Sequence, residues 1–250
     1  MTSALVTSAP PLTRLFRVAY GPDSFAARLW QHVHDDGTFG NRFDDPSGQP
    51  DLLARREVVA PVRRFRVIYC ATPRAGVFAE TITRFRPSPQ LWLGLQRIAD
   101  DEPVDASLLG GVVPASWRLQ RLVGGTDIRQ TLRFVDVMAP ETRAQLTRAL
   151  APLLDRLEVT DLDLSAMMNK DLRRFSQEVA RHIYEQVDET GIPRFAGSRY
   201  LSRHNPEWEL WAIYHDRLRH TRHPSKSIFP DDSGLVEACR RLGLAPPPAF

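Results

Sequence analysis

The stretch at residues 67–82 constrains the fold of this 250-residue chain more than any other. Its first four residues are apolar and β-prone, which predicts a buried strand. Thr72 and Pro73 then predict a helix start, with Thr72 as the N-cap and Pro73 at the first helical position. Glu80 follows in an apolar setting, where a carboxylate usually has either a function or a charged partner. An ion pair with one of the chain's many arginines is the structural alternative.

The composition is that of a globular protein with an ordinary charge content. The hydrophobic fraction is 42% and the charged fraction is 25%, enough for one sizeable core or two small ones. Lys and Arg exceed Asp and Glu by 33 − 30 = 3. This mild positive balance fits a small anionic or phosphate ligand, and it is too weak to indicate nucleic acid by itself.

Cysteine and histidine usage narrows the function classes further. Cys70 and Cys239 form no Cys-x-x-Cys pattern, which predicts a reducing, cytoplasmic location. No apolar run approaches the roughly 18 residues that a membrane span needs, so we expect no membrane association. His215, His220 and His223 fit no zinc-ligand spacing, and no metal site is expected.

Further elements are predicted along the chain. Residues 1–12 are expected to form a flexible tail, and residues 217–250 a basic, proline-rich extension. Strands are expected at 15–20, 116–119, 131–135, 195–202 and 208–214, with the glycine-rich residues 124–127 as a connection. Helices are expected from 139, where Pro152 should kink or restart the helix, and over 169–187, where apolar residues recur every four positions.

Three polar side chains occur where a ligand could approach. Arg17 lies inside an apolar run and points either to solvent or into a cleft. Arg42 follows Gly40 and Asn41, which let a backbone approach a ligand while the guanidinium clamps a phosphate or carboxylate. A surface loop is the alternative for Arg42. Ser202 falls where a predicted strand ends, as either a binding hydroxyl or a turn serine.

Taken together, these residues resemble the RES-domain family, named for its Arg, Glu and Ser. The resemblance runs from about residue 15 to about residue 214 and has five parts: Leu15-Phe16-Arg17-Val18, Phe39-Gly40-Asn41-Arg42-Phe43, Tyr69 followed eleven residues later by Glu80, the helix at 174–184, and the segment 197–204 leading to Trp211-Ala212-Ile213-Tyr214. The chain departs from the family at Asn41 and Phe43, where members usually have Gly and Trp. The segments 43–68 and 84–150 are also long.

The resemblance implies an α+β, ADP-ribosyltransferase-like fold, with twisted sheets flanked by helices around an NAD cleft. It implies a catalytic domain at residues 13–216 with an insertion around 84–150. It also implies breakdown of NAD+ at the nicotinamide–ribose bond, with NAD+ as substrate and no separate cofactor. Many members are toxins paired with an Xre-type helix-turn-helix antitoxin that covers the cleft, so any contact with nucleic acid would be indirect.

The same resemblance assigns roles to residues. The catalytic set is Glu80, Arg42 and Tyr69, and the substrate-binding set is Arg17, Ser202, Arg203 and Asn41. Cleavage passes through an oxocarbenium-like cation, which a carboxylate in an apolar pocket stabilises. The arginines 17 and 42 would hold the pyrophosphate, Tyr69 would orient the nicotinamide ring, and Ser202 would bind the ribose or carboxamide.

Two other function classes stay open at this stage. The first is transfer of ADP-ribose to a macromolecule. Transferases of this broad fold often carry a second acidic residue two positions before the catalytic glutamate, and this chain has Phe78 there. The second is a non-enzymatic binding module, supported only by the short basic stretch at 217–226, which is the kind of charge run that usually faces solvent.

Overall fold

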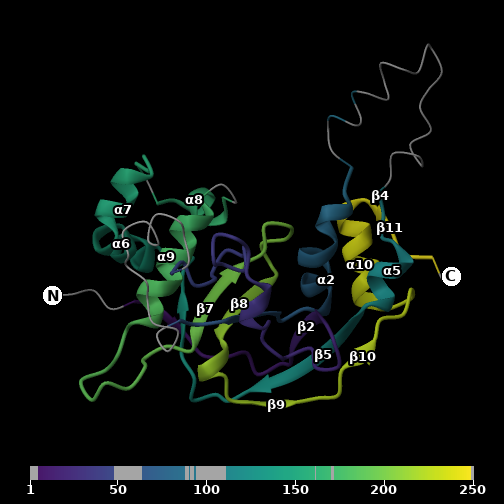
Figure 1. Ribbon diagram of the computed structural model, residues 1–250, viewed down its shortest axis with the longest axis horizontal. Helices are drawn as coiled ribbons and strands as arrows, with labels where there is room; N and C mark the ends of the chain where they lie inside the picture. The colour runs from purple at the N-terminus through teal and green to yellow at the C-terminus, as the bar shows by residue number, and fades with distance from the viewer. Residues whose placement is uncertain are drawn as a thin grey trace.

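The computed structural model describes residues 5–47, 64–87, 90, 93, 111–160, 162–169 and 172–248. Over these residues the chain forms a large mixed β-sheet flanked by helices (Figure 1). The α+β fold class predicted from the sequence is therefore confirmed. Within the described ranges, every helix is too short or too polar to span a lipid bilayer.

The large sheet has the strand order β1-β6-β7-β8-β3-β2-β5-β10, and β9 pairs with β5 beside this path. Its strands are β1 (Thr7–Ser8), β2 (Leu15–Tyr20), β3 (Val67–Ala71), β5 (Arg121–Ile128), β6 (Phe134–Asp136), β7 (Gly197–Leu201), β8 (Glu209–Tyr214), β9 (His220–Arg222) and β10 (Lys226–Ser227). β6 and β7 run parallel, and the other described pairs in this sheet are antiparallel. A small parallel pair joins β4 (Gly111–Val112) to β11 (Leu244–Ala245).

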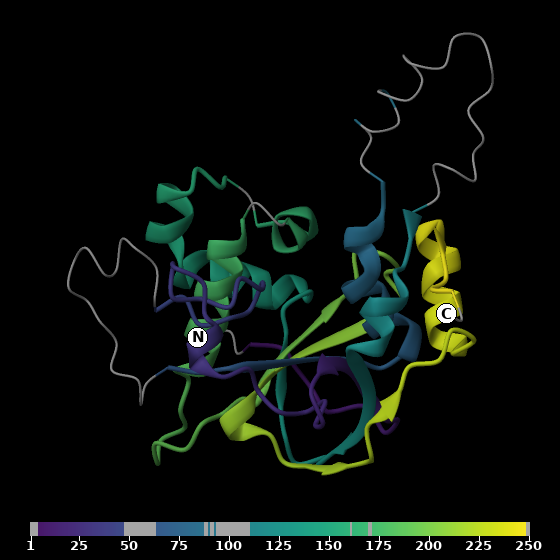
Figure 2. The same ribbon diagram turned by 45° about the vertical axis from the view of Figure 1, so that its right-hand side comes forward.

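Helices stand in two groups above the sheet, and β7 and β8 run between them (Figures 1 and 2). One group holds α6 (Pro140–Ala149), α7 (Ala151–Arg156), α8 (Leu164–Met168) and α9 (Arg173–Tyr184). The other holds α2 (Arg74–Ile82), α5 (Ala115–Leu119) and α10 (Ser233–Leu242). Short 3₁₀ turns occur at η1 (Trp30–His32), η3 (Thr83–Phe85) and η4 (His215–Arg217).

The sheet buries apolar side chains on both faces. On β2, Leu15 belongs to a smaller core cluster, whereas Phe16 packs against the larger one, which also contacts Tyr69 of β3. Because side chains two residues apart in a strand share a face, Arg17 lies on the face of Leu15. The side chains of Tyr69 and Arg17 are therefore on opposite faces of the sheet.

Helix α2 follows β3 directly and packs against α10 and β2. It starts one residue later than predicted, because Pro73 occupies the N-cap with extended dihedral angles (φ −82°, ψ 137°). Thr72 does not cap the helix, since its hydroxyl oxygen accepts a hydrogen bond from Trp211 Nε1 at 3.1 Å. The side chain of Thr72 thus ties the strand–helix junction to β8.

Two predicted features within residues 84–150 are wrong. Residues 116–119 form helix α5, whose buried Trp117 lies 6.3 Å from the ring of Phe78 on α2. The glycines 124 and 125 lie inside β5, not in a connection. At position 124 a Cβ atom would stand 1.9 Å from Ser24 Oγ. Glycine is therefore needed here because Ser24 packs closely against the strand backbone, and not because the chain turns.

The predicted helix break at Pro152 is confirmed. Helix α6 ends before Leu150, and α7 begins at Ala151 with Pro152 in its first turn. The helix predicted at 169–187 forms as α9, and the strands predicted at 15–20 and 208–214 form as β2 and β8.

Segments predicted as a tail, an insertion and an extension contribute to the sheet. Of the tail at 1–12, residues 7 and 8 form β1, which pairs with β6, and Leu5 is buried. The region 84–150 supplies β5, paired with β2 over six residue pairs, and also β6. From the C-terminal 217–250, β9 and β10 pair with β5, and α10 packs on α2.

Candidate functional site

Glu80 lies near the end of α2, and it is exposed. The prediction of an apolar pocket around its carboxylate is wrong. Val77, Phe78 and Ala79 turn to the core, while the helical rotation carries Glu80 to the outer side of α2. Neighbours in sequence are therefore not the neighbours of this side chain.

Ser202 fixes the Glu80 carboxylate from another element. Ser202 Oγ donates a hydrogen bond to Glu80 Oε1 at 2.8 Å and accepts one from the backbone N–H of His204 at 3.1 Å. Ser202 is only 1% exposed and directly follows β7. Two residues selected from the sequence, 122 positions apart, are thus joined by one hydrogen bond.

The charges of Arg42 and Glu80 both influence the side chain of Tyr200. The Arg42 guanidinium carbon lies 5.7 Å from the centroid of the Tyr200 ring, which packs 4.8 Å from the Phe43 ring. Burial raises the pKa of Tyr200, the negative charge of Glu80 raises it further, and the charge of Arg42 opposes this rise. A cation and a carboxylate therefore lie on the same side of the sheet around one buried phenol.

Tyr69 holds the loop that carries Arg42. Its hydroxyl donates to Asp44 Oδ1 at 2.9 Å and accepts from the backbone N–H of Phe43 at 3.0 Å. Asn41 donates to Asp44 Oδ2 from its backbone at 2.6 Å and from its side chain at 2.9 Å. Burial raises the pKa of the Asp44 carboxyl, and these hydrogen bonds counter the rise.

The same loop is tied to the helix group that contains α9. The backbone oxygen of Asn41 accepts a hydrogen bond from Gln177 Nε2 at 3.0 Å. The buried Asp45 pairs with Arg64 at 3.2 Å and with Arg181 of α9 at 3.6 Å. A buried carboxylate with two cationic partners fixes the backbone next to Arg42.

His204 and Arg203 lie on the same side of the cluster as Glu80. His204 Nε2 is 2.9 Å from Thr83 Oγ1, directly beyond α2. Burial lowers the pKa of His204; the charge of Glu80 opposes this, and the charges of Arg203, Arg86 and Arg42 add to it. Arg203 is exposed, with Nε 3.4 Å from His204 Nε2.

Arg17 does not join this cluster. Its side chain is 9% exposed on the opposite face of the sheet, and its NH1 group donates to the backbone oxygen of Ala26 at 3.1 Å. Burial lowers the pKa of Arg17, and interactions with Cys70, Asp23 and Tyr69 oppose this change. The expectation that Arg17 and Arg42 together flank Glu80 is not met in the structure.

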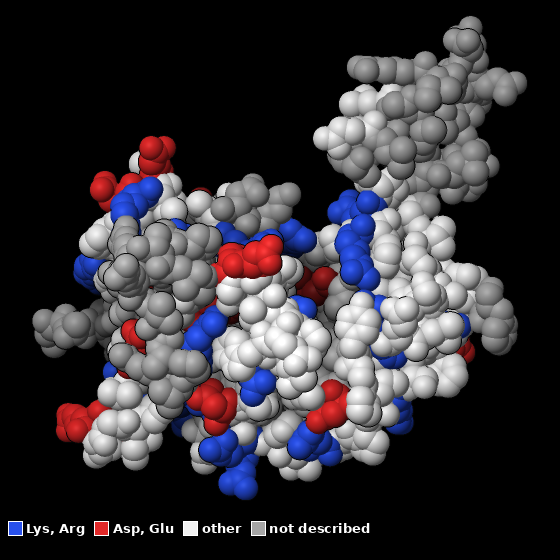
Figure 3. Space-filling view, in the orientation of Figure 1, with Lys and Arg blue, Asp and Glu red and all other residues white. Residues whose placement is uncertain are grey.

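A hollow lies between the two helix groups (Figure 3). Figure 3 shows acidic atoms in the depth of this hollow and basic groups on the rim nearer α2. Two further pockets lie elsewhere, and Glu80, Arg42 and Ser202 line neither of them. The described residues contain no group of three or more His, Cys, Asp or Glu side chains that could hold a metal ion.

Sequence reasoning missed Asp44 and Tyr200 as members of the cluster. Asp44 stood in a run of turn residues, where a buried acid has no distinguishing pattern. Tyr200 had a signal in the alternation of β7, because Tyr200 and Ser202 are two residues apart and therefore share a face.

Comparisons with known proteins add one remote likeness. The chain is similar to a chain in the crystal structure of the M. tuberculosis MbcT-MbcA toxin-antitoxin complex, with 12% sequence identity, a TM-score of 0.44 and coverage of 89% of this chain and 87% of that chain. No protein-family model matches the chain, and no curated protein does. A TM-score this low leaves the function to be inferred from the residues themselves.

Proposed function

We propose that this chain is an NAD+-consuming enzyme that cleaves the bond between nicotinamide and ribose, as a glycohydrolase or a phosphorylase. The observation that carries the proposal is the hydrogen bond from Ser202 Oγ to Glu80 Oε1 at 2.8 Å. It supports the pairing of Glu and Ser that the RES-domain resemblance requires. The cation of Arg42 on the nearby Tyr200 ring supports it further.

Glu80 would stabilise the positive charge that develops on the ribose as nicotinamide leaves. Nicotinamide departs as a neutral base, so one carboxylate suffices and no general acid is required. Glu80 is exposed in the free protein, and a bound substrate would exclude water from it, which strengthens the interaction between charges. Ser202 would keep the carboxylate in one orientation before the substrate arrives.

The basic groups suited to the pyrophosphate differ from those first expected. Arg42 and Arg203 lie around Glu80 and His204, whereas Arg17 lies beneath the sheet. We therefore assign pyrophosphate binding to Arg42 and Arg203. Tyr69 would act by holding the Arg42 loop through Asp44, and Asn41 would do the same.

Incubation of the purified chain with NAD+ and measurement of free nicotinamide tests the proposal. We expect release by the wild type and a loss of about 10²–10³ in rate for Glu80→Gln, as for removal of a group that stabilises transition-state charge. Glu207→Gln is the matched control, because Glu207 is an exposed glutamate in the turn between β7 and β8. No release by the wild type, or full release by Glu80→Gln, would contradict the proposal.

The acceptor and the cellular role are the finer parts of this proposal. In a phosphorylase, phosphate takes the place of water and bonds to the ribose carbon that nicotinamide leaves, so dependence of the rate on phosphate separates a phosphorylase from a glycohydrolase. Transfer of label from tagged NAD+ to a macromolecule would instead indicate ADP-ribosyl transfer, which buried Phe78 at the second-acid position disfavours.

A toxin role with an Xre-type antitoxin predicts growth arrest on expression and relief by the product of an adjacent helix-turn-helix gene.

A further inference from the structure

A second pocket lies on the face of the sheet that carries the smaller core cluster. Its volume is about 400 Å³, in the range of small-molecule sites. Phe25 and Leu218, which belong to the smaller cluster, form part of its wall. It is therefore separate from the Glu80 cluster, whose side chains lie on the other face.

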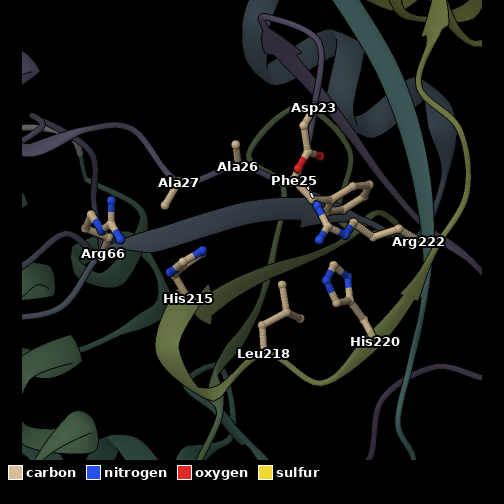
Figure 4. Close-up of a pocket in the computed structure, with 9 residues that line it drawn as sticks. All are labelled: Asp23, Phe25, Ala26, Ala27, Arg66, His215, Leu218, His220 and Arg222. Atoms are coloured by element: carbon tan, nitrogen blue, oxygen red, sulfur yellow. Dashed lines mark hydrogen bonds and ion pairs between the residues drawn. The ribbon is translucent and has the colours of Figure 1, made fainter.

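Basic side chains from three segments surround this pocket (Figure 4). Arg66 precedes β3, His215 begins η4, and His220 and Arg222 belong to β9. The acid in its lining is Asp23, which pairs with Arg222. Two arginines against one carboxylate leave the pocket with surplus positive charge, and the two histidines add donors beside them.

The surplus charge is concentrated on Arg66. Its NH1 group donates to the backbone oxygen of Arg28 at 3.2 Å, and its guanidinium carbon lies 5.8 Å from the Trp30 ring. Among the described residues no carboxylate stands within ion-pair distance of Arg66. The guanidinium is thus held by a neutral carbonyl on one side and retains donors for an anion.

A buried cation stands directly behind the wall. Arg17 donates to the backbone oxygen of Ala26, a lining residue, and is 9% exposed. Within the described part of the chain it too has no carboxylate at ion-pair distance. Burial of a cation without a close counter-ion is costly, and an anion in the adjacent pocket would offset that cost.

The pKa values of the two histidines also reflect the positive charge around the pocket. Burial lowers the pKa of His215, and the positive charge of Arg66 lowers it further. The charges of Arg17 and Arg222 act in the same direction, and the negative charge of Asp216 opposes them. Burial and the charge of Arg222 likewise lower the pKa of His220. Both imidazoles are therefore biased toward the neutral form, and a bound anion would favour their protonation.

The pocket is also held in shape by its own contacts. His220 Nδ1 lies 2.8 Å from Thr126 Oγ1, and the His220 ring stands edge-on to Phe25 at 5.7 Å. Asp23 Oδ1 accepts the backbone N–H of Phe25 at 2.8 Å and so anchors the partner of Arg222. Fixed donors lower the ordering cost of binding a ligand.

We propose that this pocket binds a compact phosphate-bearing small molecule, with Arg66 and Arg222 as the main contacts and His215 and His220 beside them. A phosphate group suits either end of the site because it carries up to two negative charges and several acceptor oxygens for a guanidinium fork, and Arg66 and Arg222 lie at opposite ends of the pocket (Figure 4). The proposal does not depend on the reaction at Glu80.

Calorimetric titration of the full chain with inorganic pyrophosphate and with ribose 5-phosphate, at constant ionic strength, tests the site. We expect saturable binding of at least one probe, weakened about tenfold or more in Arg66→Gln and in Arg222→Gln. Arg219→Gln is the matched control, since Arg219 is exposed in the same segment and outside the pocket lining. Circular dichroism shows which variants are folded. Arg66 forms no ion pair with the described residues, whereas Arg222 pairs with Asp23, so Arg66→Gln keeps the test decisive if Arg222→Gln does not fold.

Four outcomes would overturn the proposal. One is the absence of saturable binding by the wild type. The second is equal binding by folded Arg66→Gln and the wild type. The third is an equal loss in Arg219→Gln, which would indicate general charge attraction. The fourth is loss of probe binding in Arg42→Gln, which would place the probe at the other face. Undiminished binding by Arg42→Gln supports a separate site and holds even if the chain releases no nicotinamide.

Discussion

The Oγ atom of Ser202 lies 2.8 Å from Oε1 of Glu80 and donates a hydrogen bond to it. The serine is buried at the end of β7, whereas the glutamate is exposed on α2. One residue is therefore fixed by its surroundings and the other is fixed mainly by its partner. A carboxylate that is both accessible and oriented is suited to meet a developing cation.

Replacement of Ser202 by alanine should lower kcat/KM for nicotinamide release by about 10- to 100-fold, because a hydrogen bond to a charged group contributes roughly 1.5–3 kcal/mol. Ser198→Ala is the control, since Ser198 is equally buried and lies on β7, the strand that Ser202 directly follows. Steady-state kinetics of both variants check the prediction. Equal kcat/KM for Ser202→Ala and the wild type would remove the proposed role of the hydroxyl.

Replacement of Tyr69 by phenylalanine separates two roles for this residue. The change keeps the ring and removes the hydroxyl that bonds Asp44 and the Phe43 backbone, so a scaffold role predicts loss of stability by about 1–3 kcal/mol and lower activity. A ring-stacking role predicts retained activity. Urea denaturation and the nicotinamide assay distinguish them, with Tyr214→Phe as a control that removes another buried tyrosine hydroxyl, one that donates to the backbone oxygen of Ala180.

Local patterns predicted the elements around the cluster well. The strands at β2, β3 and β8 and the helix α9 follow from apolar periodicity, which acts within a short window of sequence. The glycines of β5 were misassigned because glycine marks turns and close approaches alike, and only the position of Ser24 in space distinguishes them.

Side-chain direction was harder to predict than element type. The apolar residues around Glu80 suggested a buried carboxylate, although the rotation of α2 exposes it. Strand alternation tells which neighbours share a face with Arg17, but it does not tell which face of the sheet that is. The face is known only once Leu15 and Phe16 are assigned to their core clusters. The contact of Asp44 with Tyr69 joins residues 25 apart, and no local pattern encodes it.

Acidification should destabilise the fold as the pH falls below about 6.5. Burial lowers the pKa of four histidines in the described ranges, His182, His204, His215 and His220. The unfolded chain then binds more protons, so their contribution is fully present above the unfolded pKa and is lost as the pH falls through the folded values. Urea denaturation at pH 7.5 and 5.5 checks this.

The variant His220→Gln should show a smaller difference in unfolding free energy between the two pH values than the wild type. The comparison isolates one histidine, because the raised pKa of Asp44, which acts in the opposite direction, is common to both proteins. An equal difference in the two proteins would show that His220 does not contribute.

Gly197 should be the least replaceable glycine near the cluster. Its φ is 155°, and a Cβ atom there would stand 2.0 Å from the backbone oxygen of Ala212 on β8. Gly197→Ala should therefore lower the free energy of unfolding by more than about 3 kcal/mol or prevent folding, since the backbones of β7 and β8 would have to move apart. Gly191→Ala is the control: its φ is 81°, but nothing lies within 4 Å of the added atom, so about 1 kcal/mol is expected. Urea denaturation of both variants measures the difference, and equal costs would show that the contact with Ala212 is not what requires glycine.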